Sequence, residues 1–321
     1  MNCENFCSLF PFPYSLFPVP CSLFPVPFGI IMQVPTSSFD KISPTALLVA
    51  YARQFTDIPY SQELAQLVNA QAFVEQLQKQ QSDKSFEVAV LFESRYKAIN
   101  QVIAQFQTTQ ILELASGLLP RGMVMSGNPS TTFIESDLPG MITGKQQLVK
   151  QLVGVRSNLH FVGIDATSQP SQFPLDVDYL DSQKPITVIC EGLLLYLTLH
   201  QKQRLFANVR ELLQVYSGVW ITPDLKTKED LSRIRGNSPG LQKFSQTVRG
   251  MTATSDTDTI FDNFDQVRQF LTEQGFQLQR YSMLNVLDQL TCLQPLGINP
   301  AVAESILADS FVFALTPDIR S

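Results

Sequence analysis

The chain has 321 residues, 44% of them hydrophobic and 16% charged, proportions that exclude an intrinsically disordered protein and fit one large α/β domain or two small ones. The formal net charge of −6 argues against general affinity for nucleic acids or anionic membranes. After the N-terminal tract no apolar run approaches the roughly 20 residues of a membrane-spanning helix, so we expect a cytoplasmic protein without membrane or nucleic-acid partners.

A proline-rich repeat stands at the start of the chain. Residues 7–27 contain three tandem copies of a seven-residue motif, CSLFPFP, YSLFPVP and CSLFPVP. Each copy ends in Pro-x-Pro, which excludes a regular helix or a central strand, and the tract lacks the basic segment of a signal peptide. We expect residues 1–31 to be a disordered tail, either an interaction segment or, as we favour, a non-functional extension before Met32. Residues 32–321 are expected to form one domain.

Cysteine usage points to a reducing compartment. Cys3, Cys7 and Cys21 lie in the N-terminal tract, which leaves Cys190 and Cys292 in the body of the chain. Neither belongs to a Cys-x-x-Cys pair, so we predict buried thiols and neither a disulfide framework nor a metal site.

Three helices are predicted next, at residues 43–51, 61–77 and 84–106, and form an N-terminal helical cap. The third has apolar residues on one face of a 3.6-residue helix, at Val88, Phe92, Ile99, Val102 and Phe106. Arg95 falls inside this apolar stripe. Because a guanidinium in such a position is costly to bury alone, we expect Arg95 to have a specific partner.

Strands and helices alternate through the rest of the chain. The predicted parallel strands are residues 110–114, 132–135, 160–164, 186–190 and 218–222, and two closely spaced strands, 276–283 and 311–315, suggest an antiparallel finish. Helices are predicted at residues 139–153, 199–216 and 262–274, the last ended by Gly275. This alternation predicts an α/β fold with a mostly parallel seven-stranded sheet and helices on both faces.

An acidic residue lies in or just after each predicted parallel strand; these are Glu113, Asp137, Asp165, Glu191 and Asp224. Any one of them is commonly a helix N-cap or a first-turn residue. Because ligands of open α/β sheets bind outside the carboxyl ends of the strands, the five together predict one ligand-binding crevice at this edge.

The loop after the first strand, residues 113–122, reads ELASGLLPRG. A dinucleotide-binding loop needs Gly-x-Gly-x-x-Gly to aim a helix N-terminus at a pyrophosphate. Here only Gly117 occupies the crossing point, and Pro120 replaces the third glycine. The loop permits close approach to the backbone but disfavours a nicotinamide-dependent oxidoreductase, whereas S-adenosylmethionine, which has no phosphate, suits it.

Four segments in order, ELASGLLPRG, FIESDLPGMITGK, VGIDA and ICEGLLLYLT, make the chain from about Phe39 to its C-terminus resemble the leucine carboxyl methyltransferase family. Within that family it is most similar to the bacterial branch, O-methyltransferases of polyketide-type metabolism. The resemblance implies a Rossmann-like class I methyltransferase fold and S-adenosyl-L-methionine as the cofactor.

The resemblance also implies residue roles at the methionine end of the cofactor. Arg95 matches the family arginine that holds the cofactor carboxylate, and a bidentate guanidinium–carboxylate pair agrees with its place on an apolar stripe. Gly117 lets the backbone approach the methionine part, and Glu113 orients the loop or the cofactor amine. The chain departs from the family at Ser116 and at residues 118–119, where many members carry a second glycine or an aspartate.

Further matches concern the nucleoside. Asp137 matches the acidic residue whose carboxylate accepts hydrogen bonds from both ribose hydroxyls, and Glu135 competes for that role. Asp165 and Ala166 match the loop on the adenine side. These four residues are therefore candidates for holding the nucleoside, with the choice between Glu135 and Asp137 left open.

At the reacting end, Glu191 matches the glutamate of the family motif EG-x-x-x-YL, which makes it both a cofactor-binding and a catalytic candidate. Tyr196 is the second catalytic candidate and is expected to line the acceptor pocket. Arg121 has no role in this scheme, so a surface salt bridge or a loop staple is expected for it. His160 and His200 are the only histidines, and structural or surface roles are commoner for such residues than catalysis.

These features predict an O-methyltransferase acting on a carboxyl or hydroxyl group of a small molecule. Protein C-terminal carboxyl methylation and non-catalytic cofactor binding remain alternatives. The lack of a convincing base favours a carboxylate acceptor, which is already ionised at neutral pH. Residues 226–259 contain basic residues with no acid between Asp230 and Asp256, so this insert either attracts an anionic acceptor or forms a solvated lid helix.

Overall fold

The computed structural model describes residues 42–318 except 79–86, 170–172, 174–177, 237 and 253–259. The repeat tract and the tail predicted for residues 1–31 lie outside the described residues. Within the described part no helix is long and apolar enough to cross a membrane.

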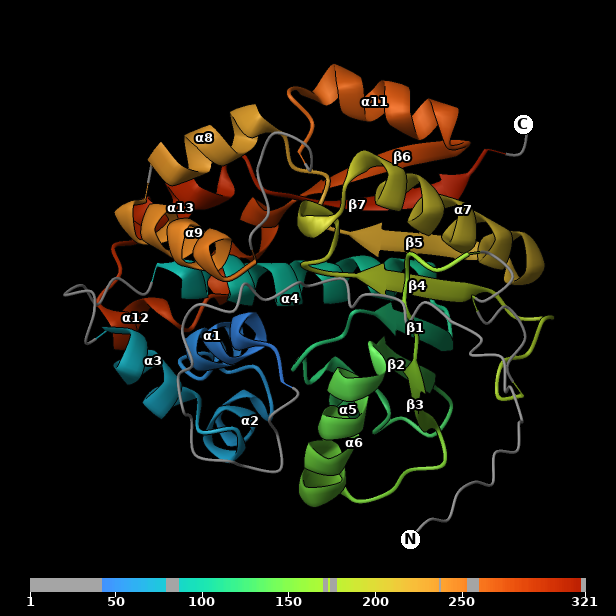
Figure 1. The fold of residues 1–321 in the computed structure, drawn as a ribbon, viewed down its shortest axis with the longest axis horizontal. Helices are drawn as coiled ribbons and strands as arrows, with labels where there is room; N and C mark the ends of the chain where they lie inside the picture. The colour runs from blue at the N-terminus through green and yellow to red at the C-terminus, as the bar shows by residue number, and fades with distance from the viewer. Residues whose placement is uncertain are drawn as a thin grey trace, which may run out of the picture.

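The centre of the fold is a seven-stranded sheet in the order β3-β2-β1-β4-β5-β7-β6 (Figure 1). The strands are β1 Gln110–Leu114, β2 Thr132–Asp137, β3 Leu159–Gly163, β4 Ile186–Cys190, β5 Gly218–Thr222, β6 Phe276–Ser282 and β7 Phe311–Pro317. Strands β1 to β5 are parallel, and β7 runs antiparallel between β5 and β6. The predicted fold class, including the antiparallel finish, is confirmed.

The two faces of the sheet bury alternate residues of each strand, as the two-residue period of a strand requires. Ile111 and Ile189 pack into one core with the helices α1 (Pro44–Arg53), α4 (Val88–Phe106), α6 (Pro139–Val153) and α13 (Pro300–Leu307). Leu112 and Trp220 pack into the other core with α7 (Leu199–Tyr216) and α11 (Phe264–Glu273). Figure 1 shows α4 along the middle of the sheet and α7 beside β5.

The helix predicted at residues 61–77 is wrong as a single element, because it is divided into α2 (Ser61–Leu67) and α3 (Ala70–Gln78). Asn69 lies between them with φ of 50°, a left-handed conformation that ends a helix and that asparagine tolerates better than most residues. The break lets α1 pack against both short helices. The helix predicted to start at residue 84 begins at Val88, and residues 84–86 lie outside the described part.

Several helices were not predicted from the sequence at defined bounds, although a lid helix was one of two alternatives for residues 226–259. The segment between β5 and α11 contains α8 (Lys228–Gly236) and α9 (Pro239–Thr252), and the connection from β6 to β7 contains η3 (Met283–Gln289), α12 (Leu293–Leu296) and α13. The short helices α5 (Arg121–Met125) and η2 (Leu194–Tyr196) follow β1 and β4. Helices α1, α8 and α9 thus lie on the side of the molecule toward which β4 and β5 point (Figure 1).

Candidate active site

The carboxyl ends of β1 to β5 meet at one edge of the sheet because these strands are parallel. The acids predicted to gather there fall into two groups. Glu113 and Glu191 are buried and bind arginines. Asp137, Asp165 and Asp224 instead accept hydrogen bonds from backbone N–H groups of the surrounding loops.

Glu191, directly after β4, is enclosed by three arginines from three different helices. Its Oε1 lies 2.8 Å from Nη2 of Arg53 and 3.3 Å from Nη2 of Arg95. Its Oε2 lies 3.3 Å from Nη2 of Arg121, whose Nη1 pairs with Glu113. We call these five residues the arginine cluster.

The arginine cluster carries more positive than negative charge, since three guanidinium groups face two carboxylates. Their side chains are almost entirely buried, with exposed fractions of 5% for Arg53, 11% for Arg95 and 0% for Arg121. Among the described residues, Nε of Arg53, Nε of Arg95 and Oε2 of Glu113 have no hydrogen-bond partner. Because buried charges and buried donors are costly when unpaired, this arrangement suits an additional anionic group such as a carboxylate.

The pKa shifts of Arg53 and Glu191 keep both side chains charged. Burial lowers the pKa of Arg53 to about 10, so its guanidinium stays charged at neutral pH. Burial alone would raise the pKa of Glu191, but the charges of Arg95, Arg53 and Arg121 together bring that pKa below its usual value. Glu191 is therefore an anion that orients the three cations.

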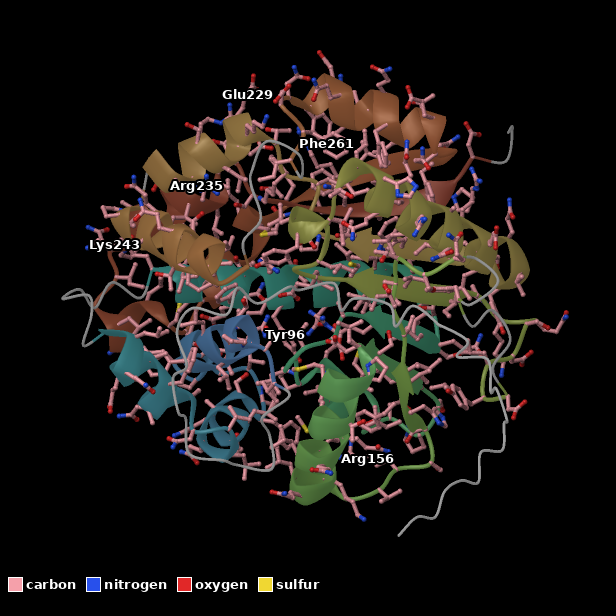
Figure 2. All side chains as sticks on the ribbon, in the orientation of Figure 1. Tyr96, Arg156, Glu229, Arg235, Lys243 and Phe261 are labelled. Carbon is pink, nitrogen blue, oxygen red and sulfur yellow. The ribbon has the colours of Figure 1, made fainter. Side chains whose placement is uncertain are left out.

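Of the two roles expected for Arg121, a surface salt bridge or a loop staple, the surface salt bridge is wrong. Arg121 is the first residue of α5, its side chain is fully buried, and its Nε donates to Oδ1 of Asn100 at 2.9 Å. Its guanidinium also lies 4.7 Å from the centre of the ring of Tyr96 on α4, a cation–π contact; Figure 2 labels Tyr96. Arg121 follows Glu113 by only eight positions in the sequence, but Glu191 is brought to the same guanidinium only by the fold.

Asp137 and Glu135 differ in how deeply their carboxylates are buried. Asp137 is half-buried at the end of β2, where its carboxylate accepts from the N–H groups of Gly117 at 2.9 Å and Leu138 at 2.8 Å. Glu135 is fully buried, pairs with Lys145, and fills the space that a side chain at Gly122 would need. Asp137 is thus the carboxylate of this pair that lies at the edge.

The loop after β3 is held by its own side chains and by α7. Oδ1 of Asp165 accepts from N and Oγ1 of Thr167, both at 2.8 Å. The carbonyl oxygen of Ala166 accepts from Nδ2 of Asn208 on α7 at 3.0 Å. Asp165 is half-buried and Ala166 is buried, so this loop is packed at the carboxyl edge of the sheet.

The segment after β4 is fixed by Asp224, which follows β5. Oδ2 of Asp224 accepts from the N–H groups of Leu193 at 2.8 Å and Leu194 at 3.2 Å. Tyr196, at the end of η2, is half-buried, and burial raises the pKa of its hydroxyl to about 12. The phenol of Tyr196 is therefore neutral and can act only as a hydrogen-bond partner at ordinary pH.

Neither histidine belongs to the arginine cluster. His160 stacks on Tyr179 with ring centres 3.9 Å apart, at the edge strand β3. His200 is exposed in the first turn of α7 and lines a separate cavity with Lys202 and Phe261. Among the described residues, no group of three or more His, Cys, Asp and Glu side chains is placed to hold a metal ion.

The basic insert forms the helices α8 and α9, on which Arg235 and Lys243 are seen in Figure 2. Arg233 is exposed and pairs with Asp230 at 2.7 Å and Asp309 at 3.1 Å. Lys243 is exposed as well. The side chain of Arg249 lies outside the described part. Arg233 and Lys243 are thus solvated, whereas Lys226 at the start of the insert is buried.

Arg53 and Lys226 were missed by sequence analysis. Arg53 follows Ala46, Val49 and Ala50 on the apolar stripe of α1, the same signal that identified Arg95. Lys226 has no comparable signal, because it lies in an irregular segment after β5 and its burial depends on distant elements.

The chain is similar to one known protein family and to several solved structures. A profile described as leucine carboxyl methyltransferase matches residues 44–210. No curated protein sequence matches the chain. A protein of the DUF574 family from Streptomyces avermitilis has a similar structure, with a TM-score of 0.52 at 13% identity over 87% of this chain and 98% of that chain.

Two further solved structures are similar. A protein from Thermobifida fusca with a provisional methyltransferase assignment gives a TM-score of 0.51 at 14% identity over 90% of this chain and all of that one. A protein from Nostoc punctiforme with a provisional O-methyltransferase assignment gives 0.44 at 16% identity over 72% of this chain. The present chain spans only 59% of the length of that protein.

The family match extends over just over half of the chain and contains every residue of the arginine cluster. The resemblance deduced from the four sequence motifs is therefore confirmed. The chain belongs to the leucine carboxyl methyltransferase family and is an S-adenosyl-L-methionine-dependent methyltransferase.

Proposed function

We propose that this methyltransferase acts on an oxygen, in a carboxyl or hydroxyl group, of a small-molecule acceptor. The observation that carries its cofactor site is the excess of buried positive charge in the arginine cluster, at the carboxyl ends of β1 and β4. The choice of oxygen is supported by the resemblance of the four motifs to bacterial O-methyltransferases. We further propose that the transferase domain comprises residues 32–321, with the residues before Met32 outside it.

The methionine end of the cofactor fits the arginine cluster. Among the described residues nothing accepts from Nε of Arg95 or Arg53, so each can offer this donor to a carboxylate, and Arg95 is the most exposed of the three arginines. Oε2 of Glu113 has no partner among the described residues and suits an ammonium group. In this proposal Arg95 and Arg53 bind the carboxylate, and Glu113 orients the amine.

The nucleoside fits the other half of the edge. Asp137 binds the ribose hydroxyls with the lone pairs left by its two backbone hydrogen bonds. Gly117 has φ of 48°, and a Cβ there would meet no atom closer than 4.0 Å, so a ligand can approach its backbone. Asp165 and Ala166 flank the adenine.

At the reacting end, Glu191 acts through the arginines that it orients and is therefore a positioning residue in this proposal. Tyr196 lines the acceptor side and donates a hydrogen bond, since its phenol stays protonated. When bound, the cofactor supplies a methyl group on a sulfonium, which is the reactive group. The residues of the chain contribute alignment and exclusion of water, which are the main demands of an in-line displacement.

Calorimetry with S-adenosylmethionine, S-adenosylhomocysteine and NAD tests the cofactor. The first two should bind and NAD should not, and Arg53→Lys should weaken binding because an ammonium does not reproduce the guanidinium fork. Absence of binding by S-adenosylmethionine would overturn the proposed cofactor site.

A labelled-methyl transfer assay against size-fractionated extract of the expressing cells tests the acceptor. Label in the small-molecule fraction, in an ester or ether linkage, is the expected result. Label in the protein fraction that alkali releases as methanol would favour a protein C-terminal carboxylate instead. Cofactor binding without transfer to any fraction would favour a non-catalytic binding protein.

A further inference from the structure

Lys226 presents a buried amine that nothing in the proposed cofactor site uses. It lies four residues after the end of β5, with 7% of the residue exposed. Its Nζ is buried and has no hydrogen-bond partner among the described residues. Because an unpartnered buried polar group is destabilising, a retained amine of this kind points to a ligand or a reaction that needs it.

Lys202 provides the contrast within the same protein. It too is a buried lysine beyond a carboxyl strand end, but its Nζ donates to the carbonyl oxygen of Leu197 at 2.6 Å. Lys202 therefore fastens the start of α7 to the preceding segment. Lys226 has no such structural task among the described residues.

The sheet order places Lys226 on the acceptor side of the crevice. The proposed nucleoside and methionine contacts follow β3, β2 and β1, and the next strands at the same edge are β4 and β5. Lys226 follows β5, two residues after Asp224, which fixes the segment that carries Tyr196. A ligand lying beyond the methionine end therefore meets the loop after β5.

We propose that Lys226 accepts the proton of the acceptor, and hence that the natural acceptor is a hydroxyl compound such as a phenol rather than a carboxylic acid. This inference rests on the proposed function and names its substrate class. It also reverses the sequence-based preference for a carboxylate acceptor, which rested on the lack of a base. A carboxylate needs no proton acceptor, whereas a hydroxyl does.

The hydroxyl oxygen forms a bond to the methyl carbon while the carbon–sulfur bond of the sulfonium breaks, and the sulfur keeps that electron pair as a thioether. The hydroxyl proton passes to the lone pair of neutral Lys226 Nζ, which becomes an ammonium. Lys226 returns the proton to water after the product leaves.

The electrostatic surroundings support a neutral amine. Burial lowers the pKa of Lys226 to about 8. The charged groups around it are Asp224 in the same loop, Asp230 on α8, Asp309 before β7 and Arg95 on α4; the three carboxylates raise the pKa and Arg95 lowers it. A base that titrates near the working pH is the most effective kind.

An NMR titration of lysine-labelled full-length protein tests the amine without any acceptor. The signal of Lys226 is identified by its absence from Lys226→Met, and the signal of Lys202 is identified in the same way by its absence from Lys202→Met. A Lys226 pKa of about 8 is expected. An ordinary value near 10.4 would overturn the proposal, because such an amine is protonated at working pH.

The product from labelled methyl transfer tests the acceptor class. Ethers survive mild alkali and esters release methanol, so an alkali-stable product is expected. An alkali-labile product would overturn this proposal and leave O-methyl transfer intact. Failure of the wild-type protein to transfer methyl to any compound would remove the proposed function and this inference together.

Two variants test the role of the side chain. Lys226→Met and Lys226→Arg should both lower kcat by about 100-fold or more and remove the ionisation near pH 8, because neither can accept a proton. Retained activity in Lys226→Arg would show that charge alone matters and would overturn the base role. Binding of S-adenosylhomocysteine by each variant, unchanged within about threefold, verifies that it is folded.

Discussion

The two halves of the carboxyl edge of the sheet are built by different means. Over β2 and β3, Asp137 and Asp165 are held by N–H groups from nearby loops. Over β1 and β4, the arginine cluster joins side chains as far apart in sequence as Arg53 and Glu191, which are separated by 138 positions. We call these the backbone-held half and the arginine half.

The difference matches the two ends of the proposed ligand. Sugar hydroxyls need acceptors with free lone pairs, and carboxylates held by backbone donors keep such lone pairs available. A carboxylate ligand needs buried cations, which only an opposing anion such as Glu191 makes tolerable in the absence of ligand. The arginine half should therefore be sensitive to charge, and the backbone-held half to hydrogen-bond geometry.

The largest effect is expected for Glu191→Gln. It leaves three buried guanidinium groups facing Glu113 alone, so the free energy of unfolding should fall by about 3–5 kcal/mol, measured by urea denaturation. Glu229→Gln on the exposed surface of α8 (Figure 2) is the matched control and should change stability by less than about 0.5 kcal/mol. Equal stability of both variants would show that the arginines do not depend on Glu191.

A pH effect on stability of somewhat smaller size is expected at Lys202 on α7, which does not belong to either half. Burial lowers the pKa of Lys202 to about 8, so below that pH the native state contains a buried ammonium. Between about pH 8 and 10.4 the native state has lost this proton and the unfolded state has kept it, so stability should rise with pH.

The rise attributable to Lys202 should be about 3 kcal/mol and should be missing from Lys202→Met. Urea denaturation at several pH values, compared between the two proteins, measures it. If the free energy of unfolding depends on pH in the same way in both proteins, the ammonium of Lys202 is not destabilised by burial.

Arg95→Ala should weaken S-adenosylhomocysteine binding by about 30-fold or more, because one donor pair to the ligand carboxylate is lost. It should leave the affinity for methylthioadenosine, which lacks that carboxylate, nearly unchanged. Calorimetry with both ligands separates the two ends of the site. Arg268→Ala on α11 is the control, because Arg268 is exposed. Equal weakening of both ligands by Arg95→Ala would contradict the assigned carboxylate contact.

Asp137→Asn should weaken both ligands equally, by about tenfold, because the ribose is common to them. The same calorimetric pair measures this. If only S-adenosylhomocysteine loses affinity, Asp137 contacts the methionine part and the division of the edge into two halves is wrong. Glu135→Gln, which alters the buried ion pair with Lys145, should mainly lower stability instead.

Much of this protein was determined by its sequence alone. Strand β4 is a run of apolar residues bounded by polar ones, and such local patterns specify strands because both faces of a parallel sheet are buried. The predicted bounds of β1, β4 and β5 agree with the structure. The sequence also placed Asp137 and Asp165 at the ends of β2 and β3, but it left open whether Glu135 or Asp137 lies at the edge of the sheet.

Only the tertiary structure decided the arginine half and the burial of Lys226. Arg121 looks like a surface residue in the sequence, and its burial follows from the approach of β4 and α4. Arg53 and Glu191 become partners only when α1 packs over the end of the sheet. The reason is physical: a buried charge is tolerated only where distant elements supply its partners, and no local pattern records which elements will meet.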